Sequence, residues 1–585
     1  MDEKKLTGYP SIDKPWLKYY SKESINAKLP ARTLYQNIYN NNKSHLTEIA
    51  LEYFGNKISY KSLFKNVDDV AKAFVSNGVK KGDKVILFTS ATPEMVYVTL
   101  ALCRIGAVAN MINPVFTEEQ IRDRINETDA TLLISLDQLY GKIEKVIAQT
   151  TIKKSVIIPV CNSMPMPLSI IAGMKMNKKL TYGETLVRWN DFVKTGRNIT
   201  DIVDAEYEKD RPLIMVYSSG TTGASKGIVL TNDGINATIS HYFGPDFPYT
   251  RKDRFLQMIP IWFSTGIVLC VFMPLCVGIT SILEPVFSKE NFAKDIKKYK
   301  PSMTLGTTSL WLYAANWEGL KDTDLSNMTF PITGGEQVLP RVEKTINNFL
   351  KSHGCKSILL KGYGMCELGS TVTSDAMTTN KTGSTGFPIK DVTVSAFDIE
   401  TNKEMQYGQR GEIRVQSPAR MKEYFKNPEA TEKYFYTDEN GNKWGCTGDI
   451  GYVDEEGFIY ILGRASDKFI SKTGREVFCF DIKNVILQNE NIASCEVVAL
   501  QKDNYYVPVV HIVLEENCHD SQESILYAIH HLCLDKLEDD CIPCAYKIRE
   551  NFPVKSSGKK DFEALRQEKG GFFLPQNNTL IAVNL

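Results

Sequence analysis

The alternation of apolar and polar positions divides the first part of the chain into short strands and amphipathic helices. Residues 48–60 alternate around Gly55-Asn56, which is typical of a β-hairpin. Apolar residues then recur at helical spacing from Val67 to Val75, and Asn77-Gly78 marks the end of that helix. Strand-like and helix-like stretches follow in turn over 85–88, 94–105, 107–112, 118–126 and 131–134. This order predicts βαβ units, and hence a parallel sheet covered by helices.

The longest apolar run of the chain covers residues 266–279. It is interrupted by Pro274 and Gly278 and is too short to cross a bilayer. We interpret it as a buried helix followed by a strand, so we expect no transmembrane segment. A small α+β unit near the C-terminus is indicated by strand and helix patterns over 497–500, 507–513 and 521–534.

Length and composition limit the class of protein. A chain of 585 residues is too long for one hydrophobic core, so two or more domains are expected. An apolar content of 43% and a charged content of 24% are typical of globular proteins. The 69 Lys and Arg residues balance the 69 Asp and Glu residues, so no global field attracts nucleic acid or an anionic membrane. We expect no nucleic-acid partner, and any anion site must be local.

The N-terminus and the cysteines indicate a cytoplasmic protein. Residues 1–10 are polar and lack the apolar core of a secretory signal. The thirteen cysteines are an odd number and show no framework spacing, which favours reduced thiols. Cys541 and Cys544 have the spacing of a redox or metal pair. Because no second pair lies nearby, we interpret their spacing as incidental.

Residues 161–180 interrupt the alternation of strands and helices. Met164-Pro-Met-Pro167 leads into an apolar stretch at 168–172. The lysines that follow are Lys175, Lys178 and Lys179. An apolar face beside lysines can contact a membrane, as in an enzyme that takes lipid substrates. We favour a local lid packed on the sheet, with peripheral membrane contact as the alternative.

The segment from Tyr217 to Gly227 carries the clearest chemical signal. It reads Y-S-S-G-T-T-G-A-S-K-G, follows a strand-like run at 213–217, and precedes a helix-like stretch after Asn232. The glycines allow the backbone to expose N–H groups, the hydroxyls add donors, and the lysine adds positive charge for a polyphosphate. The spacing is not that of a Walker A motif. The residues expected to bind phosphate are Ser218, Ser219, Gly220, Thr221, Thr222, Gly223 and Lys226.

This loop resembles the phosphate loop of the adenylate-forming superfamily, which includes acyl-CoA synthetases, adenylation domains and luciferase. The family pattern is S-G-T-T-G-x-P-K-G, and Ser225 stands at the position of the proline. Similar motifs occur in the family's order from about residue 50 to residue 565. The resemblance implies an α/β protein with a large layered N-terminal domain that contains parallel sheets. It also implies a small, mobile α+β C-terminal lid domain.

The motif from Pro260 to Gly266, P-I-W-F-S-T-G, resembles the family segment that walls the acid pocket. The resemblance places Phe263 at the aromatic position that turns between the two half-reactions. Ser264 stands where amino-acid-activating relatives carry an Asp that pairs with the substrate's α-ammonium. Because a neutral hydroxyl does not compensate a buried ammonium, the acid is expected to lack an α-amine. The implied substrate pocket consists of Trp262, Phe263, Ser264, Gly335 and Gly364.

Three further motifs resemble nucleotide-binding elements of the family. Thr333-Gly-Gly-Glu336 resembles the glycine turn that lies against adenine. The segment 361–367, K-G-Y-G-M-C-E, resembles Y-G-x-T-E, whose Tyr stacks on the base and whose Glu holds magnesium. Cys366 replaces the Thr of that motif, and a thiol is a weaker donor than a hydroxyl. The segment 444–449 resembles W-x-x-T-G-D, whose Asp bonds both ribose hydroxyls. The implied ATP-binding residues are Gly334, Gly335, Glu336, Tyr363, Gly364, Cys366, Asp449 and Arg464, with Glu367 for Mg²⁺.

The boundary between the two domains is implied by Gly463-Arg464, with Ser466 and Asp467 as the hinge. The resemblance therefore assigns residues 1–465 to the N-terminal adenylation domain and residues 466–585 to the lid. The segment 552–559, F-P-V-K-S-S-G-K, resembles the family motif L-P-x-T-x-x-G-K, which ends in the catalytic lysine. The implied catalytic residues are Lys559, Thr221, Thr222 and Glu367.

The implied reaction has two halves, in which a carboxylate first forms an acyl-adenylate and a thiol then displaces AMP. Our first hypothesis is a stand-alone acid–thiol ligase that uses ATP, Mg²⁺ and coenzyme A on an apolar acid, medium- or long-chain rather than aryl. The second is an enzyme that loads its acid onto the phosphopantetheine of a separate acyl or peptidyl carrier protein. A third, from another class, is a nucleotide-binding regulator with decayed catalysis, for which Cys366 and Ser225 are the argument.

Overall fold

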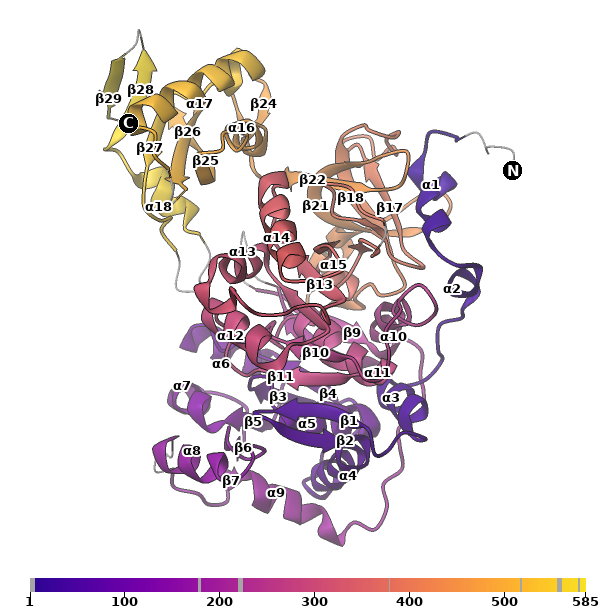
Figure 1. Cartoon of the computed structure of the whole chain (residues 1–585). Coiled ribbons are helices and arrows are strands. Elements are labelled where there is room, and N and C mark those ends of the chain that lie inside the picture. Colours follow the sequence, from indigo (N-terminus) through magenta and orange to yellow (C-terminus); the bar gives the residue numbers. More distant parts are fainter. Residues whose placement is uncertain are drawn as a thin grey trace.

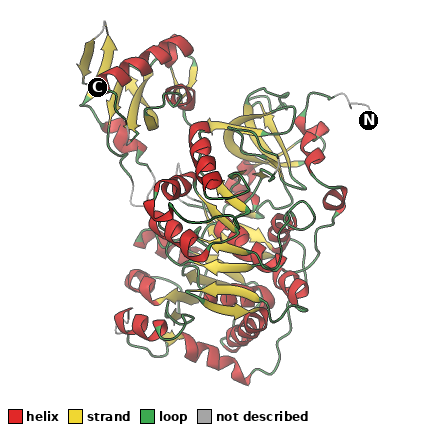
Figure 2. Cartoon of the chain, viewed as in Figure 1, coloured by secondary structure: helices red, strands yellow, loops and turns green. Residues whose placement is uncertain are grey.

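The structure is a computed structural model that describes residues 6–176, 180–218, 225–377, 379–515, 518–554, 560–576 and 579–584, without the side chains of 174–176. A large body is followed by a smaller C-terminal domain, which lies at one end of the molecule (Figure 1). Helices and strands alternate through the body (Figure 2). The α/β class predicted from the sequence is therefore confirmed.

One sheet of the body is built from the predicted βαβ units. Its strands are β3 (Lys84–Phe88), β4 (Val108–Met111), β5 (Leu132–Leu136), β6 (Lys154–Ile158), β7 (Leu186–Arg188), β8 (Pro212–Tyr217), β9 (Gly227–Thr231) and β19 (Glu423–Tyr424). Their order is β19-β9-β8-β4-β3-β5-β6-β7. The pairs from β8 to β7 are parallel, whereas β9 and β19 are antiparallel additions at one edge. The predicted parallel sheet is confirmed.

A second sheet follows the same principle. Its strands are β1 (Ile49–Tyr53), β2 (Asn56–Ser59), β10 (Arg254–Gln257), β11 (Thr280–Leu283), β12 (Met303–Gly306), β13 (Phe330–Gly334), β14 (Leu360–Tyr363), β15 (Thr373–Ser374) and β16 (Phe387–Pro388). Their order is β16-β15-β14-β13-β12-β10-β11-β1-β2. The pairs from β14 to β1 are parallel. The hairpin predicted at residues 48–60 is the antiparallel pair β1–β2.

The two sheets share one apolar core, and further helices cover their outer faces. The helices in the shared core are α3 (Leu34–Asn42), α4 (Tyr60–Ser76), α5 (Pro93–Ile105), α10 (Asn232–Ser240) and α11 (Met273–Val277). The first sheet is covered outside by α6 (Glu118–Glu127) and α7 (Asp137–Ile147). The second is covered by α12 (Lys289–Tyr299), α13 (Thr308–Asn316) and α14 (Pro340–Ser352). In such a layered α/β arrangement, the loops that follow the parallel strands lie along the same edge of each sheet.

The apolar run at 266–279 forms buried helical turns, as predicted. A π-helical segment, Thr265–Phe272, leads directly into α11, and β11 follows. Pro274 is tolerated because it lies in the first turn of α11, where its missing N–H has no helical acceptor. Gly278 ends the helix with a φ of 87°. Among the described residues, no helix has the length and apolarity needed to cross a bilayer.

A smaller antiparallel sheet connects the body to the C-terminal domain. Its strands are β17 (Thr393–Phe397), β18 (Gly411–Gln416), β20 (Phe435–Thr437), β21 (Lys443–Val453) and β22 (Ile459–Arg464). The order is β17-β18-β21-β20. The long strand β21 pairs with β20 through residues 443–445 and with β22 through residues 449–453. Further short helices are α1 (Pro10–Asp13), α2 (Lys22–Asn26), α8 (Leu168–Met176), α9 (Trp189–Thr195), whose Trp189 and Phe192 join the shared core, and α15 (Pro428–Tyr434).

The C-terminal domain has the α+β composition predicted from the sequence. Its elements are β23 (Lys468–Ile470), β24 (Glu476–Phe478), α16 (Cys479–Ile486), β25 (Ile492–Lys502), β26 (Tyr505–Leu514), α17 (Gln522–Lys536), β27 (Ala545–Ile548), α18 (Phe562–Gln567), β28 (Phe572–Gln576) and β29 (Thr579–Val583). The sheet order is β25-β26-β27-β28-β29. We assigned no element to residues 568–585 from the sequence, yet β28 and β29 form an antiparallel hairpin that extends this sheet.

All thirteen cysteines are free. Cys541 is buried and packs with the core of the C-terminal domain, and Cys544 is only partly exposed. Neither of the two forms a disulfide.

Candidate active site

A cavity of about 1310 Å³ is lined by residues of β8, β10, β12, β13, β14 and β21 and of neighbouring loops. The predicted site residues on its wall are Ser218, Lys226, Phe263, Gly334, Gly335, Tyr363, Gly364, Cys366, Glu367 and Arg464. Trp262, Ser264, Glu336 and Asp449 are not on the wall. The predicted residues that lie outside the described residues are Ser219, Gly220, Thr221, Thr222, Gly223 and Lys559.

The phosphate-loop segment is held at both ends by paired strands. Tyr217 at the end of β8 pairs with Gly227 at the start of β9. One step further, the Ser218 N–H donates to the carbonyl of Lys226 (2.9 Å), and the Lys226 N–H donates to Ser218 Oγ (3.0 Å). The sequence predicted the strand before the loop and the helix after it. The structure adds β9 between them, which returns the chain beside β8.

Glu367 and Lys226 are brought together by Tyr424, a residue that sequence reasoning missed. The Tyr424 hydroxyl donates to Glu367 Oε1 at 2.9 Å. Lys226 Nζ lies 4.8 Å from the centroid of the Tyr424 ring, which is cation–π distance. Tyr424 reaches this place because β19 pairs with β9. Its two-residue strand has no periodicity that a sequence pattern could detect.

Glu367 is the residue on the wall that fits a magnesium ion. Among the described residues, no group of three or more His, Cys, Asp or Glu side chains is arranged to hold a metal. Glu367 offers one carboxylate, and no described side chain bonds its Oε2. Mg²⁺ is commonly held by one or two carboxylates, with phosphates and waters completing the octahedron. The donor set therefore suits a magnesium ion that enters together with a nucleotide.

Tyr363, Asp449 and Arg464 form a second polar group although they are distant in sequence. The Tyr363 hydroxyl donates to Asp449 Oδ2 (2.5 Å), and Arg464 Nη1 lies 3.0 Å from Asp449 Oδ1. Arg464 also donates to the carbonyl of Thr447 at 2.9 Å. Burial raises the pKa of the Asp449 carboxyl, while Arg464 and Tyr363 oppose the shift. Asp449 thus lies directly behind the wall formed by Tyr363 and Arg464.

Two glycines on the wall suit their positions, Gly335 by its backbone conformation and Gly364 by its close contact with Ser370. Gly335 has a φ of 80°, and a Cβ on Gly364 would lie 1.6 Å from the carbonyl oxygen of Ser370. Glu336 turns away from the cavity, because its carboxylate accepts from the N–H and the hydroxyl of Ser309 at 2.9 and 3.0 Å. These bonds hold the turn against the first turn of α13.

The interior of the cavity is apolar. Phe263 forms part of its wall, whereas Ser264 is fully buried and its hydroxyl has no hydrogen-bond partner among the described residues. The other apolar residues on the wall are Tyr242, Phe247, Phe255, Leu269, Met273, Met303, Leu305, Phe330, Ile332 and Leu360. The wall of the cavity therefore has a polar region and an apolar region, which we call the apolar chamber, as in sites for amphipathic ligands.

Cys366 is also on the cavity wall, and it directly precedes Glu367 in the chain. Burial raises the pKa of its thiol to about 11, and the neighbouring Glu367 carboxylate adds to the shift, although contacts with Ser264 oppose it. At neutral pH the side chain is therefore a protonated thiol, which is a weak donor and not a nucleophile.

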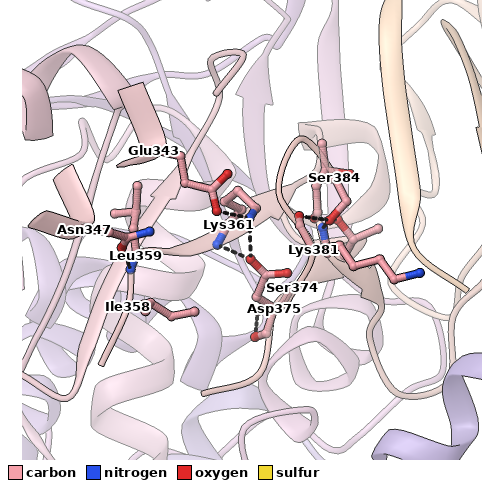
Figure 3. Close-up of polar contacts among 12 residues, drawn as sticks. Glu343, Asn347, Ile358, Leu359, Lys361, Ser374, Asp375, Lys381 and Ser384 are labelled. Carbon is pink, nitrogen blue, oxygen red and sulfur yellow. Dashed lines mark hydrogen bonds and ion pairs between the residues drawn. The ribbon is translucent and has the colours of Figure 1, made fainter. Parts of the chain in front are cut away.

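A buried ionic triad of Glu343, Lys361 and Asp375 lies beside the cavity (Figure 3), and Asp375 is on the cavity wall. Lys361 Nζ lies 2.6 Å from Glu343 Oε1 and 3.4 Å from Asp375 Oδ2. The Lys361 N–H also donates to Asp375 Oδ2 at 3.0 Å. All three side chains are almost fully buried. Asn347 accepts from the Leu359 N–H at 2.8 Å, so α14 is tied to the start of β14 as well. The triad therefore joins α14 to the strand that carries Tyr363.

We expect Asp375→Asn to change the pH dependence of stability. Burial raises the pKa of Asp375 to about 7, although Lys361 opposes the shift, so the folded chain holds a proton that the unfolded chain releases above pH 3.8. The contribution of this group to unfolding free energy is thus largest at low pH and falls between about pH 4 and 7, by roughly 1.4 kcal/mol per pH unit. Relative to the variant, the wild type should lose stability over this window, measured as urea midpoints at pH 5, 6, 7 and 8.

The exposed Asp123 of α6 provides the control for this experiment, because Asp123→Asn removes an exposed carboxylate and leaves the buried carboxylates in place. Its profile should run parallel to that of the wild type. Parallel profiles for Asp375→Asn as well would mean that Asp375 does not titrate in the folded chain.

The predicted hinge residues lie between β22 and β23. Ser466 is exposed, and Asp467 is half-buried, with its N–H donating to the carbonyl of Arg464 at 3.1 Å. Across this connection, Arg341 of α14 forms an ion pair with Glu515 at 2.7 Å and donates to the carbonyl of Glu490 at 3.0 Å. The helix that carries Glu343 therefore also contacts the C-terminal domain.

Comparisons with known proteins agree with this architecture. The chain is 26% identical over 566 residues to a long-chain-fatty-acid–CoA ligase of Bacillus subtilis, covering 93% of this chain and 96% of that protein. It is 25% identical over 480 residues to 4-coumarate–CoA ligase CCL1 of Humulus lupulus, covering 80% and 82%. Among solved structures, the anthranilate CoA ligase AuaEII in complex with anthranoyl-AMP matches with a TM-score of 0.76 at 20% identity, over 92% of this chain and 97% of that one.

A second solved structure, ATP-bound MatB from Rhodopseudomonas palustris, matches with a TM-score of 0.75 at 21% identity, over 92% and 98% of the two chains. At such identities the structural likeness establishes the fold. The family model described as "AMP-binding enzyme" matches residues 39–425, which include the phosphate loop, the glycine turn and Glu367. The chain therefore belongs to the AMP-binding enzyme family, within the adenylate-forming superfamily.

Proposed function

We propose that this enzyme is an AMP-forming acid–thiol ligase that activates an apolar carboxylic acid with ATP and transfers the acyl group to coenzyme A. One observation carries the proposal: the wall of a single cavity combines polar residues, among them Lys226, Glu367 and Arg464, with a large apolar region. Relatives named as CoA ligases, including the one from Bacillus subtilis, support the reaction type.

In the polar region of the cavity wall we assign the adenosine to Tyr363 and to Asp449, which bonds Tyr363. The ring of Tyr363 stacks on the base, and the two oxygens of Asp449 accept from the ribose hydroxyls. In the structure without nucleotide, these oxygens bond Tyr363 and Arg464. A carboxylate accepts two donors at once, which suits a ribose diol. Nucleotide binding therefore exchanges one set of donors for another and does not leave the buried charge unpaired.

The first half-reaction activates the acid. A carboxylate cannot expel oxide, so its oxygen attacks the α-phosphorus of ATP, and pyrophosphate leaves. Negative charge grows on the phosphate during this step, and preorganised donors stabilise it. We assign that role to Thr221, Thr222 and Lys559, which lie outside the described residues. Glu367 would hold a magnesium ion, which would supply charge neutralisation at the phosphates.

The second half-reaction transfers the acyl group. The sulfur of the thiol attacks the acyl carbonyl of the adenylate, the bond to phosphate breaks, and AMP leaves. One lid cannot supply Lys559 and a thiol channel at the same time, so we propose rotation about Ser466 and Asp467. This assigns residues 1–465 to the adenylation domain and 466–585 to the lid.

The experiment that tests the proposal is ATP/pyrophosphate exchange across a panel of carboxylic acids, followed by CoA-dependent AMP release. Exchange with at least one acid is expected, and AMP release is expected to require coenzyme A. Exchange without CoA-dependent release would favour transfer to a separate carrier protein. Absence of exchange with every acid would favour a nucleotide-binding regulator.

We expect the rate of activation to rise with the length of an unbranched fatty acid until the apolar chamber is filled. Each buried methylene contributes about 0.8 kcal/mol, or roughly a fourfold gain in kcat/KM. Phe255, Met303 and Phe330 lie on the wall of this chamber. The measurement is exchange with acids of increasing length, each paired with its α-amino analogue. Better activation of the amino acid than of its des-amino partner would contradict the apolar assignment.

A further inference from the structure

Two arginines of the body hold the C-terminal domain at the two ends of α16. Arg341 lies in the first turn of α14, and Arg410 lies directly before β18. Both precede the predicted hinge at Ser466 and Asp467 in the chain, whereas the residues that they bond in the C-terminal domain follow it. The arginines therefore contact the part of the molecule that the proposed reaction requires to rotate.

Arg341 is bonded beyond the C-terminal end of α16. Its Nη1 lies 2.7 Å from Glu515 Oε1 and donates to the carbonyl of Glu490 at 3.0 Å, and its Nη2 donates to the carbonyl of Ile492. A guanidinium presents several donors in one planar fork, and bonds from a charged donor are stronger than those between neutral groups. Leu339, two residues earlier, packs against the core of the C-terminal domain. One arginine thus bonds both the start of β25 and the chain after β26.

Arg410 is bonded at the first turn of α16. Its Nη1 donates to both carboxylate oxygens of Asp481, each at 3.0 Å. Its guanidinium carbon lies 4.7 Å from the ring centroids of Phe478 and Phe480, which is cation–π distance. Phe480 also packs on the strand before the hinge, where a Cβ on Gly463 would lie 2.3 Å from its ring. The start of α16 is therefore held between Arg410 and β22.

These contacts are strong enough to favour one orientation and weak enough to be broken. The side chains of Arg341 and Glu515 are 26% and 41% exposed, and those of Arg410 and Asp481 are 36% and 38% exposed. Partly exposed ion pairs contribute modestly, because water and salt screen them. Since the hinge separates each arginine from its partners, rotation of the C-terminal domain about the hinge breaks both ion pairs.

We infer that Arg341 and Arg410 are positioning residues that set the balance between the two orientations of the C-terminal domain. The inference rests on the proposed function, in which the two half-reactions need different orientations. Neither arginine lies on the cavity wall, so neither takes part in the chemistry itself. The two arginines support the half-reaction that uses the observed orientation, and they slow the one that uses the other, because only the first orientation has these bonds.

The test measures the two half-reactions separately in Arg341→Met combined with Arg410→Met. Methionine keeps much of the apolar length of arginine and removes the charge and the donors. Adenylation is measured by ATP/pyrophosphate exchange, and thioester formation by adding coenzyme A to a presynthesised acyl-adenylate. We expect the ratio of the two rates to change about tenfold, with one rate falling and the other rising. A fall of both rates in equal proportion, or no change in either, would overturn the inference.

Two further variants separate positioning from a general effect of losing arginine. Arg122→Met makes the same replacement on α6, where Arg122 pairs with Glu119 and Asp123 within the body, and both of its rates should equal those of the wild type. Arg341→Lys combined with Arg410→Lys keeps both charges but lacks the planar fork. Its ratio of rates should lie between those of the wild type and the methionine variant.

Small-angle X-ray scattering of the full chain without substrates measures the arrangement of the domains independently of catalysis. The wild type and Arg122→Met should match the arrangement in Figure 1, and the double methionine variant should depart from it. This difference in scattering without exchange for any acid would refute the proposed reaction and leave the arginine contacts as the determinant of orientation. Exchange in the wild type together with identical scattering of the double variant would refute the role of the arginines alone.

Discussion

Glu367→Gln is expected to lower acid-dependent ATP/pyrophosphate exchange by about 10³-fold, the upper end of the range for losing one group that stabilises transition-state charge. The amide keeps the size of the side chain and an oxygen that can accept from Tyr424, which now lies 2.9 Å from Oε1. It loses the negative charge that holds Mg²⁺ beside the phosphates. The measurement is exchange over a range of magnesium concentrations, and excess magnesium should restore only part of the rate.

Tyr424→Phe is the matched control, because it removes the hydrogen bond and keeps the carboxylate. Loss of one such bond to a charged group corresponds to about 1.5–3 kcal/mol at most, so the effect should be clearly smaller than that of Glu367→Gln. Undiminished exchange in Glu367→Gln would remove this residue from the metal site. Equal effects in the two variants would indicate that Glu367 acts only by holding Tyr424.

Lys559→Ala is expected to slow the adenylation half-reaction by about 10²–10³-fold and to leave the thioester half-reaction near its wild-type rate. If the lid delivers Lys559 to the phosphate in one orientation only, the second orientation does not need it. Adenylation is measured by pyrophosphate exchange, and thioester formation by adding coenzyme A to a presynthesised acyl-adenylate. Each half is thus observed without the other.

The next residue provides a close control. Lys560 has the same charge, but its Nζ pairs with the buried carboxylate of Glu496 within the C-terminal domain. Lys560→Ala should therefore lower the free energy of unfolding and leave the rates of both half-reactions near those of the wild type. If Lys559→Ala slows both halves equally, or neither, the lysine is structural and the alternating lid must be abandoned.

Elements with strong local signals were predicted closely. The helix expected at 94–105 is α5, Pro93–Ile105, and the strand expected at 85–88 is β3, Lys84–Phe88. Helix α4 begins at Tyr60, well before the first apolar residue that we counted, because Ser59 caps its first turn by accepting from the Ser62 N–H. That capping signal was present in the sequence, and weighing it with the periodicity would have given the correct start.

Other parts depended on distant partners. Residues 572–583 form strands because Phe573 pairs with Tyr546 and extends an existing sheet, so their own pattern carried little information. Residues 166–171 are apolar like a buried segment, yet the side chains of Met166, Leu168, Ile170 and Ile171 are exposed, so the lid packed on the sheet that we expected over 161–180 is not formed by them. The chain just before them is held by bonds from Asn162 and Ser163 to Glu94, a partner that no local pattern indicates.

The sequence by itself determined the α/β class, the strand before the phosphate loop and the family, because turn chemistry and hydrophobic periodicity depend on residues that are neighbours in the chain. Only the tertiary structure decided which of the motif residues meet. Tyr363 reaches Asp449, Tyr424 joins Lys226 to Glu367, and Ser264 lies behind the cavity wall. These contacts are made by strand pairing and packing between segments that are far apart in sequence. No local pattern encodes such distances, so a site can be named from its motifs while its geometry follows only from the folded chain.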